Sequence, residues 1–352
     1  MVLDDYSTDT DPRTRSSWCI NDPVIRLREW AGERAYGLPD PPVASKIGSA
    51  SKCEVKLDDK SGLLSREHAQ LTPCEGGWKI RDLESTNGLW CDGVRRPAFA
   101  LRPGLEITIG GLRLIAESPG LAALRAVVSR FLGWAREHQS AVDDALHSLR
   151  DWAAHHAALV VIGDGDLTPV VERLHGLTLG PDAPLVVCGP GDDLAGGVQA
   201  AMHGTLCAVI RRRAEAHDLA EMLGPMEQPA RPRIALCVGR AADATDVSIT
   251  VGRSAVIGVP PLATRAGELE RIVDESAADA AHALGAPSPG FTMHDLERLK
   301  AIEFKSFAEV TETVRRIIAM RTWGVTAGAA RLGITHVSLS QWTRRLDRKL
   351  ST

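Results

Sequence analysis

Two pairs of neighbouring side chains in the first third of the sequence have the chemistry to bind a phosphate group. Ser65 and Arg66 form one pair, and Thr86 and Asn87 form the other. A phosphorylated side chain carries nearly two negative charges, which hydroxyl and guanidinium donors can satisfy. An asparagine amide can also donate to and accept from a peptide backbone. The residue types therefore suit a phosphorylated peptide, provided that the fold brings the two pairs together.

A second group of side chains, near the end of the chain, could contact nucleic acid. From Arg321 onward there are six basic residues and one acidic residue, whereas the whole chain has 41 basic and 45 acidic residues. Hydroxyl, amide and guanidinium groups on one helix face can bind base edges and phosphates in the major groove. The predicted DNA-binding residues are Ser338, Gln341, Arg344, Arg345, Arg348 and Lys349.

No group of residues in the sequence has the types and spacing expected of a catalytic site or a metal site. A nucleotide-binding P-loop needs a lysine directly after a glycine, but no lysine lies between Lys79 and Lys300. The seven cysteines form no close pair, and the paired acids 164/166 and 192/193 lack a third ligand. We therefore predict no catalytic residue, no metal and no cofactor. Reduced cysteines and short apolar stretches predict a cytoplasmic protein with no membrane partner.

The elements that must position these groups change character along the chain. The composition is ordinary for a globular protein, with 44% hydrophobic and 24% charged residues among 352, and the length predicts roughly two or three domains. Residues 20–118 alternate apolar and charged positions between frequent turns, which predicts an all-β sandwich. Residues 119–157 have apolar positions at helical spacing. They predict a helical connector that lies on a neighbouring domain, or alternatively a dimerising helix.

The second half of the chain predicts two further domains. Residues 158–287 alternate short apolar runs with polar helical stretches, a pattern typical of an α/β domain with a mostly parallel sheet. Residues 288–352 are predicted to be all helix, after a linker at 286–290. Residues 1–19 are expected to be a flexible tail and not a signal peptide. The predicted fold class is thus multidomain: all-β, then α/β, then all-α.

Several short motifs follow one another in the β-rich segment. They are Ile47-Gly48-Ser49, Ser65-Arg66-Glu67-His68, Ser85-Thr86-Asn87-Gly88 and Ile107-Thr108-Ile109-Gly110. Their order resembles the forkhead-associated (FHA) domain. The resemblance implies that Ser65, Arg66, Thr86 and Asn87 bind a phosphothreonine and its flank, and we expect His68 to brace its loop.

One position departs from the FHA pattern. The family usually has an arginine where this chain has Ser49, so a principal phosphate donor is missing. Lys46, Lys52 or Arg66 could supply the charge. The alternative is an FHA-shaped sandwich that binds an unphosphorylated partner.

Two stretches of the central domain resemble a known ATPase family. The run Val259-Pro260-Pro261-Leu262-Ala263-Thr264-Arg265 and the strand at 184–189 are similar to parts of the AAA+ domain of NtrC-type, sigma-54-dependent activators. In this chain Gly189-Pro190-Gly191-Asp192-Asp193 replaces the Walker A loop, and its carboxylates would repel nucleotide phosphates. The Walker B acids and the loop that contacts sigma-54 are missing. The resemblance therefore implies a degenerate AAA+-like scaffold without ATP hydrolysis.

The run from Thr326 to Thr335 and the helix after it resemble the Fis-type helix-turn-helix that ends those activators. Gly333 suits the left-handed residue after a helix, and Thr335 can cap the next helix. Leu339, Trp342 and Leu346 are predicted to face the core. The alternative is a small helical bundle that docks on a protein.

Together these features predict a bacterial transcription regulator that binds double-stranded DNA and a phosphothreonine-containing protein, such as a Ser/Thr kinase or its substrate. One hairpin makes few base contacts, so we expect a homodimer on a two-fold site. The alternative function is an FHA adaptor in a Ser/Thr-kinase pathway that binds no DNA.

Overall fold

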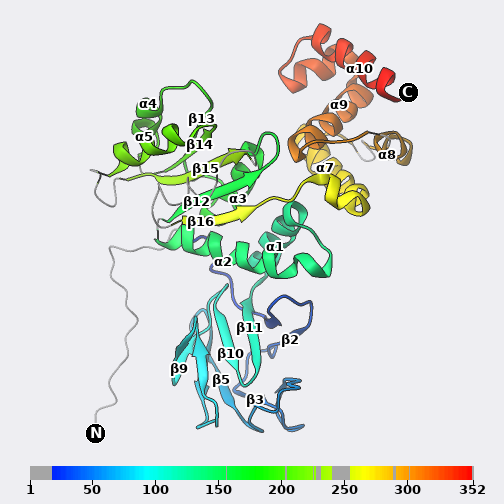
Figure 1. Ribbon diagram of the computed structural model, residues 1–352. Helices are drawn as coiled ribbons and strands as arrows, with labels where there is room; N and C mark the ends of the chain where they lie inside the picture. The colour runs from blue at the N-terminus through cyan, green and yellow to red at the C-terminus, as the bar shows by residue number, and fades with distance from the viewer. Residues whose placement is uncertain are drawn as a thin grey trace.

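The computed structural model describes residues 18–155, 157–202, 204–224, 226, 231–239, 254–287, 291–300 and 302–350. A β-sandwich, a pair of helices, a parallel sheet and a group of C-terminal helices follow one another through the molecule (Figure 1). The sandwich and the C-terminal helices lie at opposite ends (Figure 1). Among the described helices, none has both the length and the apolar character needed to cross a bilayer.

The sandwich consists of two sheets. Their strand orders are β2-β1-β11-β10-β7-β8 and β4-β3-β5-β6-β9. Alternation along each strand turns one face to the core, so that Ile80 is fully buried while Lys79 beside it is exposed. The predicted all-β sandwich is confirmed. Its strands are β1 Arg26–Glu29, β2 Ala35–Gly37, β3 Ser45–Gly48, β4 Val55–Lys56, β5 Ala69–Cys74, β6 Gly77–Asp82, β7 Leu89–Cys91, β8 Val94–Arg95, β9 Ala98–Ala100, β10 Glu106–Ile109 and β11 Leu112–Glu117.

The central region contains a parallel sheet of order β13-β14-β15-β12-β16. Its inner strands are almost continuously apolar, as a sheet covered on both faces requires. The predicted α/β content is confirmed. The strands are β12 Ala158–Gly163, β13 Leu185–Cys188, β14 Thr205–Ile210, β15 Arg233–Gly239 and β16 Ser254–Gly258, and the helices are α3 Thr168–Leu179, α4 Leu194–Ala200 and α5 Arg213–Leu223.

Two helices lie between the sandwich and the parallel sheet (Figure 1). They are α1 (Pro119–Leu132) and α2 (Gln139–His155), with a short 3₁₀ turn, Arg136–His138, before α2. Trp152 of α2 is fully buried and donates to the carbonyl oxygen of Ile234 in β15 at 3.0 Å. One hydrophobic cluster joins these helices to the sheet and to the C-terminal helices. Residues 1–17 of the expected tail lie outside the described residues, whereas Trp18 is buried in this cluster.

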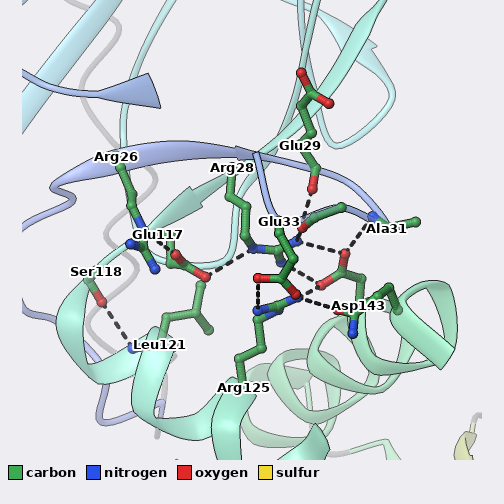
Figure 2. Close-up of polar contacts among 12 residues, drawn as sticks. Arg26, Arg28, Glu29, Ala31, Glu33, Glu117, Ser118, Leu121, Arg125 and Asp143 are labelled. Carbon is green, nitrogen blue, oxygen red and sulfur yellow. Dashed lines mark hydrogen bonds and ion pairs between the residues drawn. The ribbon is translucent and has the colours of Figure 1, made fainter. Parts of the chain in front are cut away.

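A buried arginine joins the sandwich to α2. Arg28 of β1 donates to Glu117 at 3.1 Å and to both carboxylate oxygens of Asp143 at 3.1 and 2.5 Å (Figure 2). These three side chains are at most 1% exposed. Asp143 also accepts from the backbone N–H of Ala31 at 2.8 Å. The charges are therefore paired and hydrogen-bonded, the condition under which a buried ion pair is tolerated.

The C-terminal region is helical, as predicted. A 3₁₀ segment, Leu262–Glu268, leads into the helices, and Phe307 packs edge-on against Phe131 of α1 at 5.4 Å between ring centroids. Arg321 forms an ion pair with the buried Asp295. Burial opposes ionisation of Asp295, but hydrogen bonds from Arg321 and Thr292 outweigh it and lower its pKa. Residues 288–290 of the expected linker lie outside the described residues. The helices are α7 Leu269–Leu284, α8 Met293–Lys300, α9 Phe307–Leu332 and α10 His336–Leu350.

Candidate functional site

Two loops of the sandwich meet where β3 ends. The backbone N–H groups of Ser49 and Ala50 donate to the carbonyl oxygens of Ser65 and Arg66 at 3.2 and 3.0 Å. Gly48 makes this approach possible, because a Cβ atom there would lie 2.2 Å from the Arg66 carbonyl oxygen. The sequence shows this glycine as part of a motif, but not the contact that requires it.

Hydrogen bonds join the two loops that carry the predicted pairs of side chains. Ser65 Oγ accepts a hydrogen bond from the backbone N–H of Thr86 at 3.2 Å. Asn87 Nδ2 donates to the carbonyl oxygen of Leu63, on the same loop as Ser65, at 2.7 Å. Arg66 and Thr86 are exposed, and Ser65 and Asn87 are half-buried. Hydroxyl and amide side chains of the two loops therefore lie close together at the surface, and Arg66 follows Ser65 in the chain.

His68 braces these loops from below and is fully buried. Its Nδ1 accepts from the backbone N–H of Ser65 at 3.2 Å, and its Nε2 lies 3.0 Å from the Gly88 carbonyl oxygen and 2.9 Å from Ser85 Oγ. A carbonyl can only accept, so this network assigns the ring proton to Nε2. Ser85 was not singled out from the sequence, although it directly precedes Thr86.

The charged side chains around the site differ in whether they form ion pairs. Both Lys46 and Lys52 form ion pairs with Glu67, the former at 2.5 Å. Their hydrogen bonds, that of Lys46 first, lower the pKa of Glu67 to about 2. The exposed Arg66 has no acidic partner among the described residues. Ser49 Oγ donates to the Ser65 carbonyl oxygen at 3.4 Å. Arg95, whose guanidinium lies against Gly88, likewise has no acidic partner among the described residues.

The segment predicted to be a helix-turn-helix consists of the second part of α9, a short turn and α10. Gly324 has a φ of 76° and divides α9 into two helical parts. A Cβ on Gly328 would lie 2.6 Å from the Ala319 carbonyl oxygen, so the second part packs closely against the first. Gly333 has the expected left-handed φ of 71°, and Thr335 Oγ1 accepts from the Ser338 N–H at 3.1 Å at the start of α10.

The faces of α10 divide as their spacing predicts. Leu339 and Leu346 are buried and Trp342 is half-buried. Arg345 also lines a pocket of about 360 Å³ with Glu309 and Glu312 of α9. The α10 backbone includes position 349, but the side chain of Lys349 lies outside the described residues. The exposed candidates on this helix are Ser338, Gln341, Arg344, Arg345 and Arg348.

The carboxyl ends of the parallel strands border a second pocket, of about 520 Å³. Two loop amides at this end already have acceptors in their own loops. Asp192 accepts from the Gly189 N–H at 2.8 Å, and Asp166 accepts from the Thr168 N–H at 2.9 Å.

The strand at 184–189, which resembles the one before a Walker A loop, is an edge strand of the sheet. No cluster of three or more metal-ligating side chains occurs within the described ranges.

Comparisons with known proteins match the sandwich. The FHA domain model matches residues 45–110. The ABC transporter ATP-binding/permease protein Rv1747 of Mycobacterium tuberculosis is 39% identical over 82 residues, which are 23% of this chain and 9% of that protein. A structure of the FHA-2 domain of Rv1747 is 38% identical, with a TM-score of 0.20, and covers 24% of this chain and 74% of that one. Mycobacterium tuberculosis EmbR in complex with a low-affinity phosphopeptide is 29% identical, with a TM-score of 0.24, and covers 26% and 24%. Residues 45–110 are therefore an FHA domain, within a chain that continues into an α/β sheet and a helical end.

Proposed function

We propose that this chain is a cytoplasmic bacterial transcription regulator. It binds a phosphothreonine-containing protein through the FHA loops and double-stranded DNA through α10, and it does so without hydrolysing ATP. The observation that carries the proposal is that hydrogen bonds join the loops of Ser65, Thr86 and Asn87. Arg66, next to Ser65 in the chain, is exposed and has no acidic partner among the described residues.

The hydrogen-bond inventory of these side chains supports phosphopeptide binding. Ser65 Oγ accepts from Thr86 and keeps its own proton to donate to a phosphate oxygen. Asn87 uses one N–H on Leu63, which leaves a second N–H and its side-chain oxygen for the backbone of a peptide. A phosphothreonine at this place would receive charge-assisted hydrogen bonds from Ser65 and Arg66.

The direct test is titration of the full chain with a phosphothreonine peptide and with its unphosphorylated form. Ser65→Ala and Asn87→Ala should each weaken binding of the phosphopeptide by about fivefold or more, because each removes a hydrogen bond worth roughly 1–3 kcal/mol. Thr72→Ala, at an exposed position of β5, is the matched control and should bind as the wild type does. If the Ser65 and Asn87 variants also bind as the wild type does, the assignment of the site is wrong.

Exposure and charge support the DNA-binding half of the proposal. Gln341, Arg344 and Arg345 are exposed on α10, and the short turn before this helix contains the glycine that such hairpins use. We propose a homodimer, because two hairpins on a two-fold site provide the contacts that one lacks. We also propose that the C-terminal hairpin is of the Fis type and that the chain is related to NtrC-type activators.

The loop hydrogen bonds support the absence of hydrolysis. Phosphate loops present free backbone N–H groups to the nucleotide, but the amides of Gly189 and Thr168 already donate to carboxylates of their own loops. Those carboxylates would also repel a triphosphate. A central domain of this kind is a scaffold that holds the FHA domain and the hairpin in one molecule.

One observation favours a second candidate function. Arg345 lines the pocket that contains Glu309 and Glu312, so part of α10 faces acidic side chains of its own chain. If that surface docks on a protein, the chain is an FHA adaptor without DNA binding. The adaptor should bind the phosphopeptide and protect no DNA site.

A further inference from the structure

Glu67 lies directly beside the proposed phosphate site and holds two cations. Its carboxylate pairs with Lys46 of β3 and with Lys52 of the loop that follows. The Glu67 side chain is 25% exposed, whereas the lysine side chains are 46% and 71% exposed. The carboxylate is therefore covered by the lysines, which remain accessible to a ligand.

The lysines lie on strand β3 and on the loop that follows it, which is hydrogen-bonded to the loop of the phosphate donors. Ser49 and Ala50 are hydrogen-bonded to the backbone of Ser65 and Arg66, and Lys52 and Glu67 are the next charged residues along the two loops. Because the usual arginine is absent at position 49, these lysines are among the cations that could replace its charge. In the free protein, however, Glu67 occupies them.

We propose that Glu67 is an internal competitor for the ligand's phosphate, whose carboxylate holds Lys46 and Lys52 until a phosphate dianion displaces it. This inference rests on the proposed phosphothreonine binding. A phosphate brings nearly two charges and gains by the exchange, whereas a single carboxylate would only replace one charge with an equal one. The lysines thus favour phosphothreonine over an aspartate or glutamate at the same place.

The protonation states fit this exchange. The pKa of Glu67, lowered to about 2 by the two lysines, keeps the competitor charged throughout the range in which a phosphate loses its second proton, near pH 6. Glu54 and Cys53 also act on this cluster, but the pKa of Glu54 is lowered, chiefly by the Lys46 backbone N–H, and burial raises the pKa of Cys53, so neither changes charge between pH 7 and 5. Lowering the pH from 7 to 5 therefore removes charge from the ligand and none from Glu67. Binding should weaken over that interval.

The test is titration of the full chain with one phosphothreonine peptide at low salt. Glu67→Gln should bind it about three- to tenfold more tightly, because the lysines no longer have to be released. Lys52→Ala should cost more affinity in the Glu67→Gln background than in the wild type, since only there does the ligand gain the full attraction. Glu106→Gln removes the same charge from an exposed ion pair with Arg113 on the other sheet and should change nothing.

The outcomes separate this inference from the proposed function. If the wild type fails to bind the peptide in a Ser65-dependent manner, the proposed function fails. If it does bind and Glu67→Gln is equal or weaker, Glu67 positions the lysines and does not compete, and only this inference is overturned. Equal tightening by Glu106→Gln would also overturn it, because the effect would then be one of net charge.

Discussion

Gly48 is the residue on which the closeness of the two FHA loops depends. An added Cβ would meet the Arg66 carbonyl oxygen at 2.2 Å, and backbone atoms cannot rotate away as a side chain can. Gly48→Ala should therefore lower the free energy of unfolding by about 1–3 kcal/mol, as overpacking does, and should weaken phosphopeptide binding by separating the loops.

The matched control is Gly37→Ala, in β2 of the other sheet. A Cβ at this position meets nothing within 4 Å, so it should leave the urea midpoint unchanged or slightly raised. Equal midpoints for the two variants would show that the loops are not held in the close approach that the structure describes.

At the scale of single residues, the sequence allowed candidate phosphate donors to be predicted, but not the residues that support them. Ser65, Arg66, Thr86 and Asn87 could be predicted because their types match a phosphate and their motif is local. The brace formed by His68 and Ser85, and the pairing of Glu67 with Lys46, join residues 17 and 21 positions apart. Their partners depend on how strands pair, which a local pattern does not specify.

Among the elements, the contact between β1 and α2 depends on one buried arginine. Arg28→Met should lower the free energy of unfolding by about 3–5 kcal/mol, because Asp143 and Glu117 would remain buried without their cation. Hydrogen exchange should increase in α2 and in β1.

Arg34→Met, in the connection between β1 and β2, is the control for loss of an arginine. Its ion pair with Asp58 is exposed, so its removal should have little effect on stability. A similarly small effect of Arg28→Met would mean that the buried network does not fix the sandwich to the helices.

The spacing of apolar residues predicted the strands and helices, but not always which other elements pack against them. Alternation in β6 and apolar runs in β12 to β15 correctly indicated a sandwich and a covered parallel sheet. Arg28 follows the buried Leu27 and stands at a position where alternation predicts solvent, yet both are buried because α2 covers that side. Gly324 interrupts a helical pattern, and its positive φ shows that it ends one helix and starts another.

In the molecule as a whole, the two candidate sites are separated. The FHA loops belong to the sandwich, α10 belongs to the C-terminal helices, and these lie at opposite ends (Figure 1). The proposed phosphoprotein and the proposed DNA would therefore not compete for the same surface, and the proposal predicts that both can join one ternary complex.

The measurement that tests this account most directly is a DNA footprint of the full chain, on fragments selected from genomic DNA, with and without a phosphothreonine partner. We predict a discrete protected site that binds less tightly as salt rises. Arg344→Ala should weaken it and reduce the slope of log affinity against log salt by about one if the side chain contacts a phosphate. The phosphorylated partner should join the complex without displacing the DNA. Phosphopeptide binding with no protected site at any salt concentration would contradict the regulator and leave the adaptor.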